Sequence, residues 1–180
     1  MFKAKGADVN KAKHTGTTPL YMASENGHCE VVEALLLGGA DVNKSREEGV
    51  SPPVTKAPND SCDGVNANVR RGGAAANNSW NAGSTPLLIA SRSGHCNIVD
   101  ALLRGGADVN KAANDGTTPL FVASENGHFH VVDALLRAGA NANMVRNDGV
   151  MPLHIANENG HGDVEDALLR WGTDVNKAAT

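Results

Sequence analysis

Apolar and polar residues follow one pattern along the chain, and this pattern recurs four times. Each copy holds a Pro-Leu pair with a short, mostly apolar stretch after it, then a Gly-His pair, and then apolar residues spaced i, i+1, i+4 and i+5, except that the last copy has Glu165 at i+1. Such spacing places the last four residues on one side of a helix. Each copy therefore predicts two short helices separated by a turn. The copies span residues 16–44, 83–111, 116–144 and 149–177.

The copy over 116–144 indicates where its helices begin and end. Thr118 is a favourable N-cap and Pro119 a favourable first residue, so a helix is expected over about 119–126, before a Gly. A second helix is expected over about 129–138, with Gly139 as its C-terminal stop. Helices of about ten residues or fewer are marginal alone in water. Stacking of one copy on the next must therefore stabilise them.

The segments that join consecutive copies carry hairpin-turn signals. Asp115-Gly116 and Asp148-Gly149 are dipeptides that favour tight turns between two strands. We therefore expect each connection to project from the helices as a two-stranded finger. Ala90, Ala123 and Ala156 stand where the helices of a copy meet, and their small size permits close packing.

The spacing of the prolines predicts one further, degenerate copy. The interval from Pro19 to Pro86 is twice the interval between the later neighbouring prolines, plus one position. Pro53 lies midway in this long interval to within one position, and a Gly-Ala pair at 73–74 follows it at the usual offset. An unrelated segment would match this register only about one time in ten for such a period. We therefore predict a repeat over 45–78.

This predicted repeat has polar residues where the others have apolar ones. Asn66 and Arg70 stand at core positions, and Pro58 lies within the first helix, where proline costs about 3 kcal/mol. We expect it to be loose, and we expect the copy over 16–44 to have no other neighbour. The predicted division of the chain is a remnant of a preceding repeat and finger (1–15), repeats over 16–44, 45–78, 79–111, 112–144 and 145–177, and the truncated start of a finger (178–180).

Each complete copy resembles the ankyrin repeat. The resemblance rests on the series Gly-x-Thr-Pro-Leu, Gly-His, Val-Val, Leu-Leu and Gly-Ala, which is fullest over 115–143 and extends over nearly the whole chain. The copies depart from the family at the His after Thr-Pro-Leu, which survives only as His154, and at Met151, which replaces a Thr. The resemblance implies an all-α solenoid of stacked helix-turn-helix units with β-hairpin fingers and a concave face of fingers and first helices.

Composition and charge narrow the class of partner. The 180 residues include 26 Ala, 20 Gly and 19 Asn but only 6 aromatic residues, which suits thin elements packed closely in series. Net charge is −4, and residues 79–180 hold 11 acidic and 7 basic side chains. Since Lys and Arg form no cluster, nucleic acid is not an expected partner. No apolar run is long enough to cross a bilayer, so no membrane partner is expected.

The chain start and the cysteines predict a cytoplasmic or otherwise intracellular protein. Lysines at the start are not followed by the apolar segment of a secretory signal. Three cysteines are too few and too scattered for a disulfide scaffold. Cys29 and Cys96 occupy the same position two predicted repeats apart, so no disulfide is expected to join them.

No catalytic or metal-binding chemistry is predicted. His28, His95, His128 and His161 recur at the period of the repeat, so they form a ladder spaced by about 8 to 10 Å rather than a converging ligand set. We interpret them as turn residues that bond the free ends of the two helices of their own repeat. No nucleophile has a base at a fixed spacing, and no glycine-rich loop follows a strand. We therefore expect no enzyme activity, cofactor, metal or small-molecule substrate.

The resemblance implies that a protein partner binds the fingers and the two residues that precede each Gly-His. An acidic, amide-rich surface with one Arg is expected there, and it complements a basic or polar peptide surface. Trp80 and Trp171 favour a binding surface more strongly, because exposed aromatic residues are enriched at the hot spots of protein interfaces. The pair Glu25-Asn26 occupies the same position in the first copy. The candidate protein-binding residues are Trp80, Asn81, Ser84, Arg92, Ser93, Asn114, Asp115, Thr117, Glu125, Asn126, Asn147, Asp148, Val150, Glu158 and Asn159.

The function predicted from these features is a scaffold or adaptor that binds another protein. Two alternatives stay open. The chain could be a regulatory or targeting segment of a larger multidomain enzyme such as a kinase or ubiquitin ligase, as the family's occurrence in such proteins implies. It could also be a decayed fragment without function, which would agree with the degenerate repeat and the incomplete repeats at its two ends.

Overall fold

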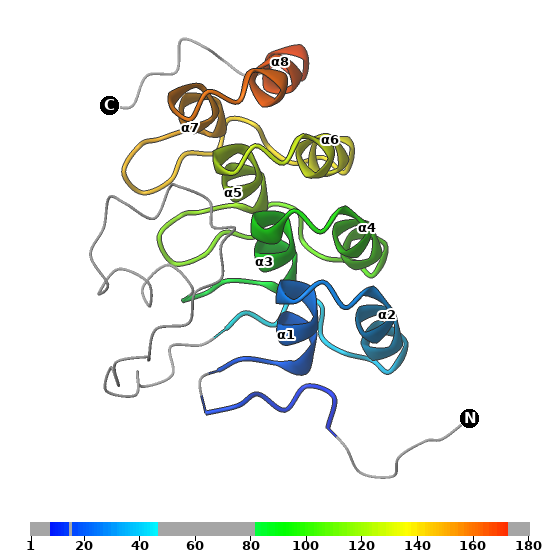
Figure 1. Ribbon diagram of the computed structural model, residues 1–180. Coiled ribbons are helices and arrows are strands. Elements are labelled where there is room, and N and C mark those ends of the chain that lie inside the picture. Colours follow the sequence, from blue (N-terminus) through cyan, green and yellow to red (C-terminus); the bar gives the residue numbers. More distant parts are fainter. Residues whose placement is uncertain (1–7, 15, 47–81, 173–180) are drawn as a thin grey trace, which may run out of the picture.

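The computed structural model describes residues 8–14, 16–46 and 82–172. These ranges contain eight short helices in four antiparallel pairs (Figure 1). The first helices of the pairs form an inner layer beside the fingers, and the second helices form an outer layer. The helices are α1 (Pro19–Glu25), α2 (Cys29–Leu37), α3 (Pro86–Ser93), α4 (Cys96–Arg104), α5 (Pro119–Glu125), α6 (Phe129–Arg137), α7 (Pro152–Glu158) and α8 (Gly162–Arg170).

The helix boundaries predicted from the sequence are confirmed to within a residue. In α1, α3 and α5 a threonine hydroxyl accepts a hydrogen bond from the third backbone amide of the helix, as at Thr118 and Phe121 (3.1 Å). Each of these helices has proline in its first turn. Met151 starts α7 without a side-chain cap and is instead fully buried. Local capping signals therefore decide where the inner helices begin.

The apolar face predicted for the second helices forms the core between units. Val131, Val132, Leu135 and Leu136 of α6 are each no more than 2% exposed. Ala123 and Ala156 are 0% exposed, at the inner helices, as their small size had indicated. Burial of one such aliphatic side chain contributes about 1.5 to 3 kcal/mol. Packing between neighbouring units is therefore the main source of stability.

The first pair of helices packs directly on the pair that starts at Pro86. Helix α1 contacts α3 and α2 contacts α4, in the same manner as the later neighbours. The expectation that residues 16–44 have no neighbour other than a repeat over 45–78 is therefore wrong. The reason is physical, since two complete units bury matching apolar faces, whereas Asn66 and Arg70 offer polar groups at those positions.

The connection between these two pairs closes as an ordinary finger. The amide of Arg46 donates to Ser84 O (2.8 Å), and the amide of Gly83 donates to Arg46 O (2.9 Å). The same two bonds close the next finger, from Ala113 to Thr117 O (2.9 Å) and from Gly116 to Ala113 O (3.0 Å). The first finger is thus the common one with the segment 47–80 added between its two ends, which accounts for the long interval between Pro19 and Pro86. Apart from residues 45 and 46, the repeat predicted over 45–78 lies outside the described residues.

A row of asparagines confirms that the stack is continuous across this connection. Asn43 Oδ1 accepts from the Asp108 amide (2.8 Å), and Asn43 Nδ2 donates to Gly106 O (3.2 Å). Asn110 makes the same two bonds to the following unit, at 2.8 and 3.3 Å. Asn10 makes them to the first unit, at 2.7 and 3.4 Å. Residues around Asn10 therefore occupy the place of the end of a preceding unit.

The fingers differ from the predicted two-stranded hairpins. Within the described ranges they hold no strand, and each is a turn closed by one pair of backbone bonds. Neighbouring fingers bond to each other instead, from the Asn114 amide to Ala82 O (3.1 Å) and from the Asn147 amide to Asp115 O (3.0 Å). Each finger is too short to form a hydrogen-bond ladder of its own, so its backbone groups bond to the neighbouring finger. None of the helices described is long and apolar enough to cross a membrane.

Removing the extra segment of the first finger should leave the stack intact. Deleting residues 47–80 joins Arg46 to Asn81 and gives this finger the length of its neighbours. A shorter loop costs less closure entropy, by about 2 kcal/mol here, so the free energy of unfolding should rise by up to that amount. Urea unfolding followed by circular dichroism measures it. Deleting 112–144, a complete unit of similar length, is the matched control and should lower stability. Lower stability or lost cooperativity in the 47–80 deletion would contradict the direct stacking.

Candidate functional site

The fingers and the first helices meet along one side of the stack, which we call the inner face (Figure 1). The last turn of each first helix holds one charged residue, and we call these four residues the inner row. Several predicted residues are exposed or half-buried at these places. The inner row is Glu25, Arg92, Glu125 and Glu158; the other such candidates are Ser93, Asn114, Asp115, Asn126, Asn147, Asp148, Val150 and Asn159.

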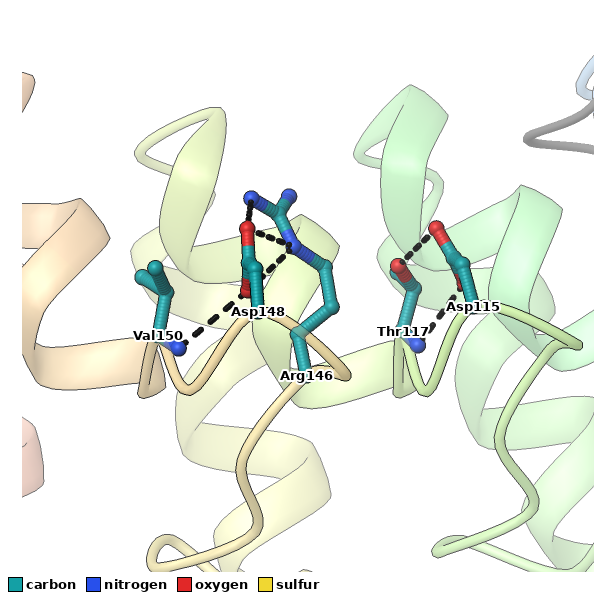
Figure 2. A network of polar contacts seen from close by, with 5 residues as sticks. All are labelled: Asp115, Thr117, Arg146, Asp148 and Val150. Atoms are coloured by element: carbon teal, nitrogen blue, oxygen red, sulfur yellow. Dashed lines mark hydrogen bonds and ion pairs between the residues drawn. The ribbon is translucent and has the colours of Figure 1, made fainter. Parts of the chain in front are cut away.

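Two candidates are buried and serve the fingers themselves. Ser84 is 0% exposed and Thr117 is 5% exposed. Asp115 accepts hydrogen bonds from the Thr117 hydroxyl (2.7 Å) and amide (2.9 Å), which holds its carboxylate in place (Figure 2). We therefore leave Ser84 and Thr117 out of the proposed contact surface. Trp80 and Asn81 lie outside the described residues, and Trp171 is 51% exposed just after α8.

The amide side chains of the inner face are used within the stack. Asn126 Nδ2 donates to Val122 O (2.8 Å) within its own unit. Asn147 Nδ2 donates to Asn114 O in the preceding finger (3.2 Å), and Asn159 Nδ2 donates to Glu125 O in the preceding unit (2.9 Å). Asn147 and Asn159 therefore fix neighbouring units relative to each other.

The recurring histidines join neighbouring units rather than the two helices of their own unit. The Nε2 atoms of His95, His128 and His161 lie 3.2, 3.0 and 3.1 Å from carbonyl oxygens of the inner row. Since a carbonyl accepts, each Nε2 carries the proton. The reason is that the last turn of each first helix has carbonyl groups without helical partners, and the next unit reaches them. The acceptors are Glu25 O, Arg92 O and Glu125 O, respectively.

A glycine beside each of these carbonyls makes room for the ring. Gly127 has φ of +70°, and a Cβ added there would lie 2.6 Å from His161 Nδ1. Gly94 has the same relation to His128, at 2.8 Å from Cε1. The glycine of one Gly-His pair therefore leaves space for the histidine ring of the next pair. This contact places the backbone of the inner row.

Arg146 adds a cation that the sequence did not place on this face. Its guanidinium lies 4.6 Å from the centre of the Phe121 ring and bonds both carboxylate oxygens of Asp148, with Nε at 3.0 Å from each (Figure 2). These bonds lower the pKa of Asp148. The only local signal was an Arg two residues before an Asp in a finger, and the contact with Phe121 crosses to the preceding unit. The face is therefore acidic with interspersed guanidinium groups, rather than acidic with one Arg.

Glu125 is the most enclosed carboxylate of the inner row. Burial raises its pKa, and the charges of Arg92 and Arg146 act in the opposite direction. Phe121 and Glu125 are four residues apart on α5, so they share one helix face, and Arg146 lies along it. Tyr21 and Glu25 repeat this spacing on α1, where burial raises the pKa of Tyr21 and Arg46 opposes it. The units of α1 and α5 therefore carry similar sets of an aromatic residue, a Glu and an Arg.

The outer layer holds a shallow cleft between α4 and α6. It is lined by residues that include Cys96, His130 and Asp133 and has a volume of about 770 Å³. Burial raises the pKa of the Cys96 thiol, which disfavours the thiolate, the nucleophilic form. Cys29 and Cys96 are free thiols and lie in adjacent units, not two units apart as predicted. In the described ranges, no three His, Cys, Asp or Glu side chains are grouped as metal ligands.

Comparison with protein families agrees with this geometry. A model described as ankyrin repeats, in three copies, matches residues 87–179, and a model of the single ankyrin repeat matches 15–46. The chain belongs to the ankyrin-repeat family. No curated protein matches it. Ankyrin repeats are generally protein–protein interaction modules and typically non-catalytic, and no catalytic domain is detected in this chain.

The fit between a glycine and the histidine ring of the next unit can be tested with two alanine substitutions. Gly127→Ala introduces a Cβ into the His161 ring, while Gly160→Ala changes a glycine of similar φ (+74°) that has nothing within 4 Å. Both variants take the left-handed backbone strain of about 1 to 2 kcal/mol. Gly127→Ala should cost about 1 to 3 kcal/mol more, because the ring must shift. Urea unfolding of both variants measures the difference, and equal losses would contradict the packing role of the ring.

Proposed function

We propose that this ankyrin-repeat chain is a scaffold or adaptor module that binds a protein partner on its inner face. The observation that carries the proposal is the inner row, where four charged side chains stand one per unit on backbone positions of which three are bonded to the next unit. Backbone positions held in this way lose little freedom on binding, so only the side chains have to be ordered, which favours recognition. The fingers extend the same surface with Asp115 and Asp148.

A basic or polar partner surface complements this face best. Carboxylates outnumber guanidinium groups among the charged side chains placed there, so the field over the inner face is negative. Such exposed charges act mainly on the association rate and on partner choice. The carboxylates are Glu25, Asp115, Glu125, Asp148 and Glu158, and the guanidinium groups are Arg46, Arg92 and Arg146.

Reversing two charges of the inner row should weaken partner binding. The double variant Glu125→Lys and Glu158→Lys changes the summed charge of these eight side chains from −2 to +2, so the inner face becomes positive and affinity for a basic partner should fall by about fivefold or more. The loss should shrink as salt is added. A pull-down with mass spectrometry identifies the partner, and titration of that partner against both proteins measures the change.

The matched control carries the same charge change on the outer layer. Glu33 and Asp166 are exposed on α2 and α8, and replacing both with Lys should leave partner affinity unchanged. Circular dichroism checks that both double variants keep their helices. Equal affinity in the inner-row variant would move the binding site away from this face. Recovery of a specific partner would also remove the alternative of a fragment without function.

A further inference from the structure

The charges of the inner row have a fixed order along the stack. Direct packing of α1 on α3 makes Glu25 and Arg92 neighbours, although the whole extra segment of the first finger separates them in the chain. The order is acidic, basic, acidic, acidic, from α1 to α7. We propose that Arg92 selects an extended partner segment in which one acidic residue lies between basic residues three positions away on either side. This inference rests on the proposed function.

The spacing of the row is fixed by the stack. Each member belongs to the last turn of a first helix, and consecutive first helices pack directly on one another. Packed helices lie about 8 to 10 Å apart. The bonds from His95, His128 and His161 hold the carbonyls of Glu25, Arg92 and Glu125 to the next unit, so these three positions keep that interval.

An extended chain matches the interval with a whole number of residues. In the polyproline II form it advances about 3.1 Å per residue with three residues per turn, so three residues cover about 9 Å and bring the side chain back to the same side of the segment. A segment that runs along the inner face therefore brings every third residue opposite a member of the row. A helical segment advances about 1.5 Å per residue and needs about six or seven residues for the same step. The two forms thus require different sequence spacings.

Arg92 lies near polar side chains of both neighbouring units. Its charge acts on Glu125 in the next unit and on Tyr21 in the preceding one, beside Glu25. It is half-buried, so a like charge placed against it would be poorly screened. A partner acid there is attracted, and a partner lysine is repelled. Opposite Glu25, Glu125 and Glu158 the preference is reversed, which gives the order basic, acidic, basic, basic.

Synthetic peptides can test this order against the full-length chain. The matched peptide is a decamer with Lys at positions one, seven and ten, Glu at position four, and Ser, Thr or Ala elsewhere. Its reversed sequence covers the opposite direction of binding. The control peptides have the same composition with Glu at position one or ten. Fluorescence anisotropy at low salt should show that the better of the two matched peptides binds about fivefold more tightly than either control peptide.

Substitution of Arg92 provides the decisive comparison. Arg92→Gln should remove the difference between matched and control peptides, and Arg92→Glu should favour a peptide with Lys at all four positions. Arg137→Gln is the matched control, since Arg137 pairs with Asp133 (2.9 Å) on α6 of the outer layer. It should keep the full difference. Circular dichroism checks that each variant is folded.

The outcomes separate this inference from the proposed function. Equal binding of matched and control peptides, or a difference that survives Arg92→Gln, overturns the role of Arg92. If both peptides also lose affinity in the Glu125→Lys, Glu158→Lys variant, binding on the inner face stands without the charge order. Tighter binding of a peptide whose charges have the wider, helical spacing overturns the extended form. Binding of no peptide overturns the inference, while the pull-down still decides the proposed function.

Discussion

Every feature of this protein depends on the packing of one helix pair against the next. Its helices have seven to nine residues, a length at which isolated helices are marginal in water. The effect of a neighbouring unit is seen in the exposed fractions of equivalent residues. Val31 on α2 is 49% exposed, whereas Ile98 and Val131, which have a preceding unit beside them, are each 1% exposed. An apolar residue at this position is buried where a preceding unit packs against it and exposed where none does.

Polar contacts between units then fix how the apolar faces meet. The histidines, the asparagines and the sideways bonds between fingers all connect one unit to the next, and they repeat along the stack. Hydrophobic contacts have little directional preference, while hydrogen bonds require particular distances and angles. The stack is therefore stabilised by burial and aligned by these bonds. The placement of Arg92 and Glu125 follows from that alignment, because each owes its backbone position to a histidine of the following unit.

The sequence predicted local features well and features between units less well. Helix boundaries depend on neighbours in the chain, such as Thr118 with Pro119, so the pattern located them within a residue. Arg146 was missed because its place depends on Phe121 in the preceding unit. The histidines were assigned to the wrong pair of helices for the same reason. The neighbour of the first unit was also misidentified, because a matching period in the chain says nothing about adjacency in space. The protein-binding residues stay a prediction.

The long finger after the first unit has a consequence for how such chains can change. Its two ends are held by the same pair of backbone bonds as in the short fingers. The packing of the helices on either side therefore does not depend on the length of the chain between them. Insertions at this point leave the rest of the fold unchanged. Evolution, or a protein engineer, can therefore lengthen or replace the sequence between Arg46 and Gly83 independently of the stack. Chain length alone consequently overestimates the number of units in a protein built this way.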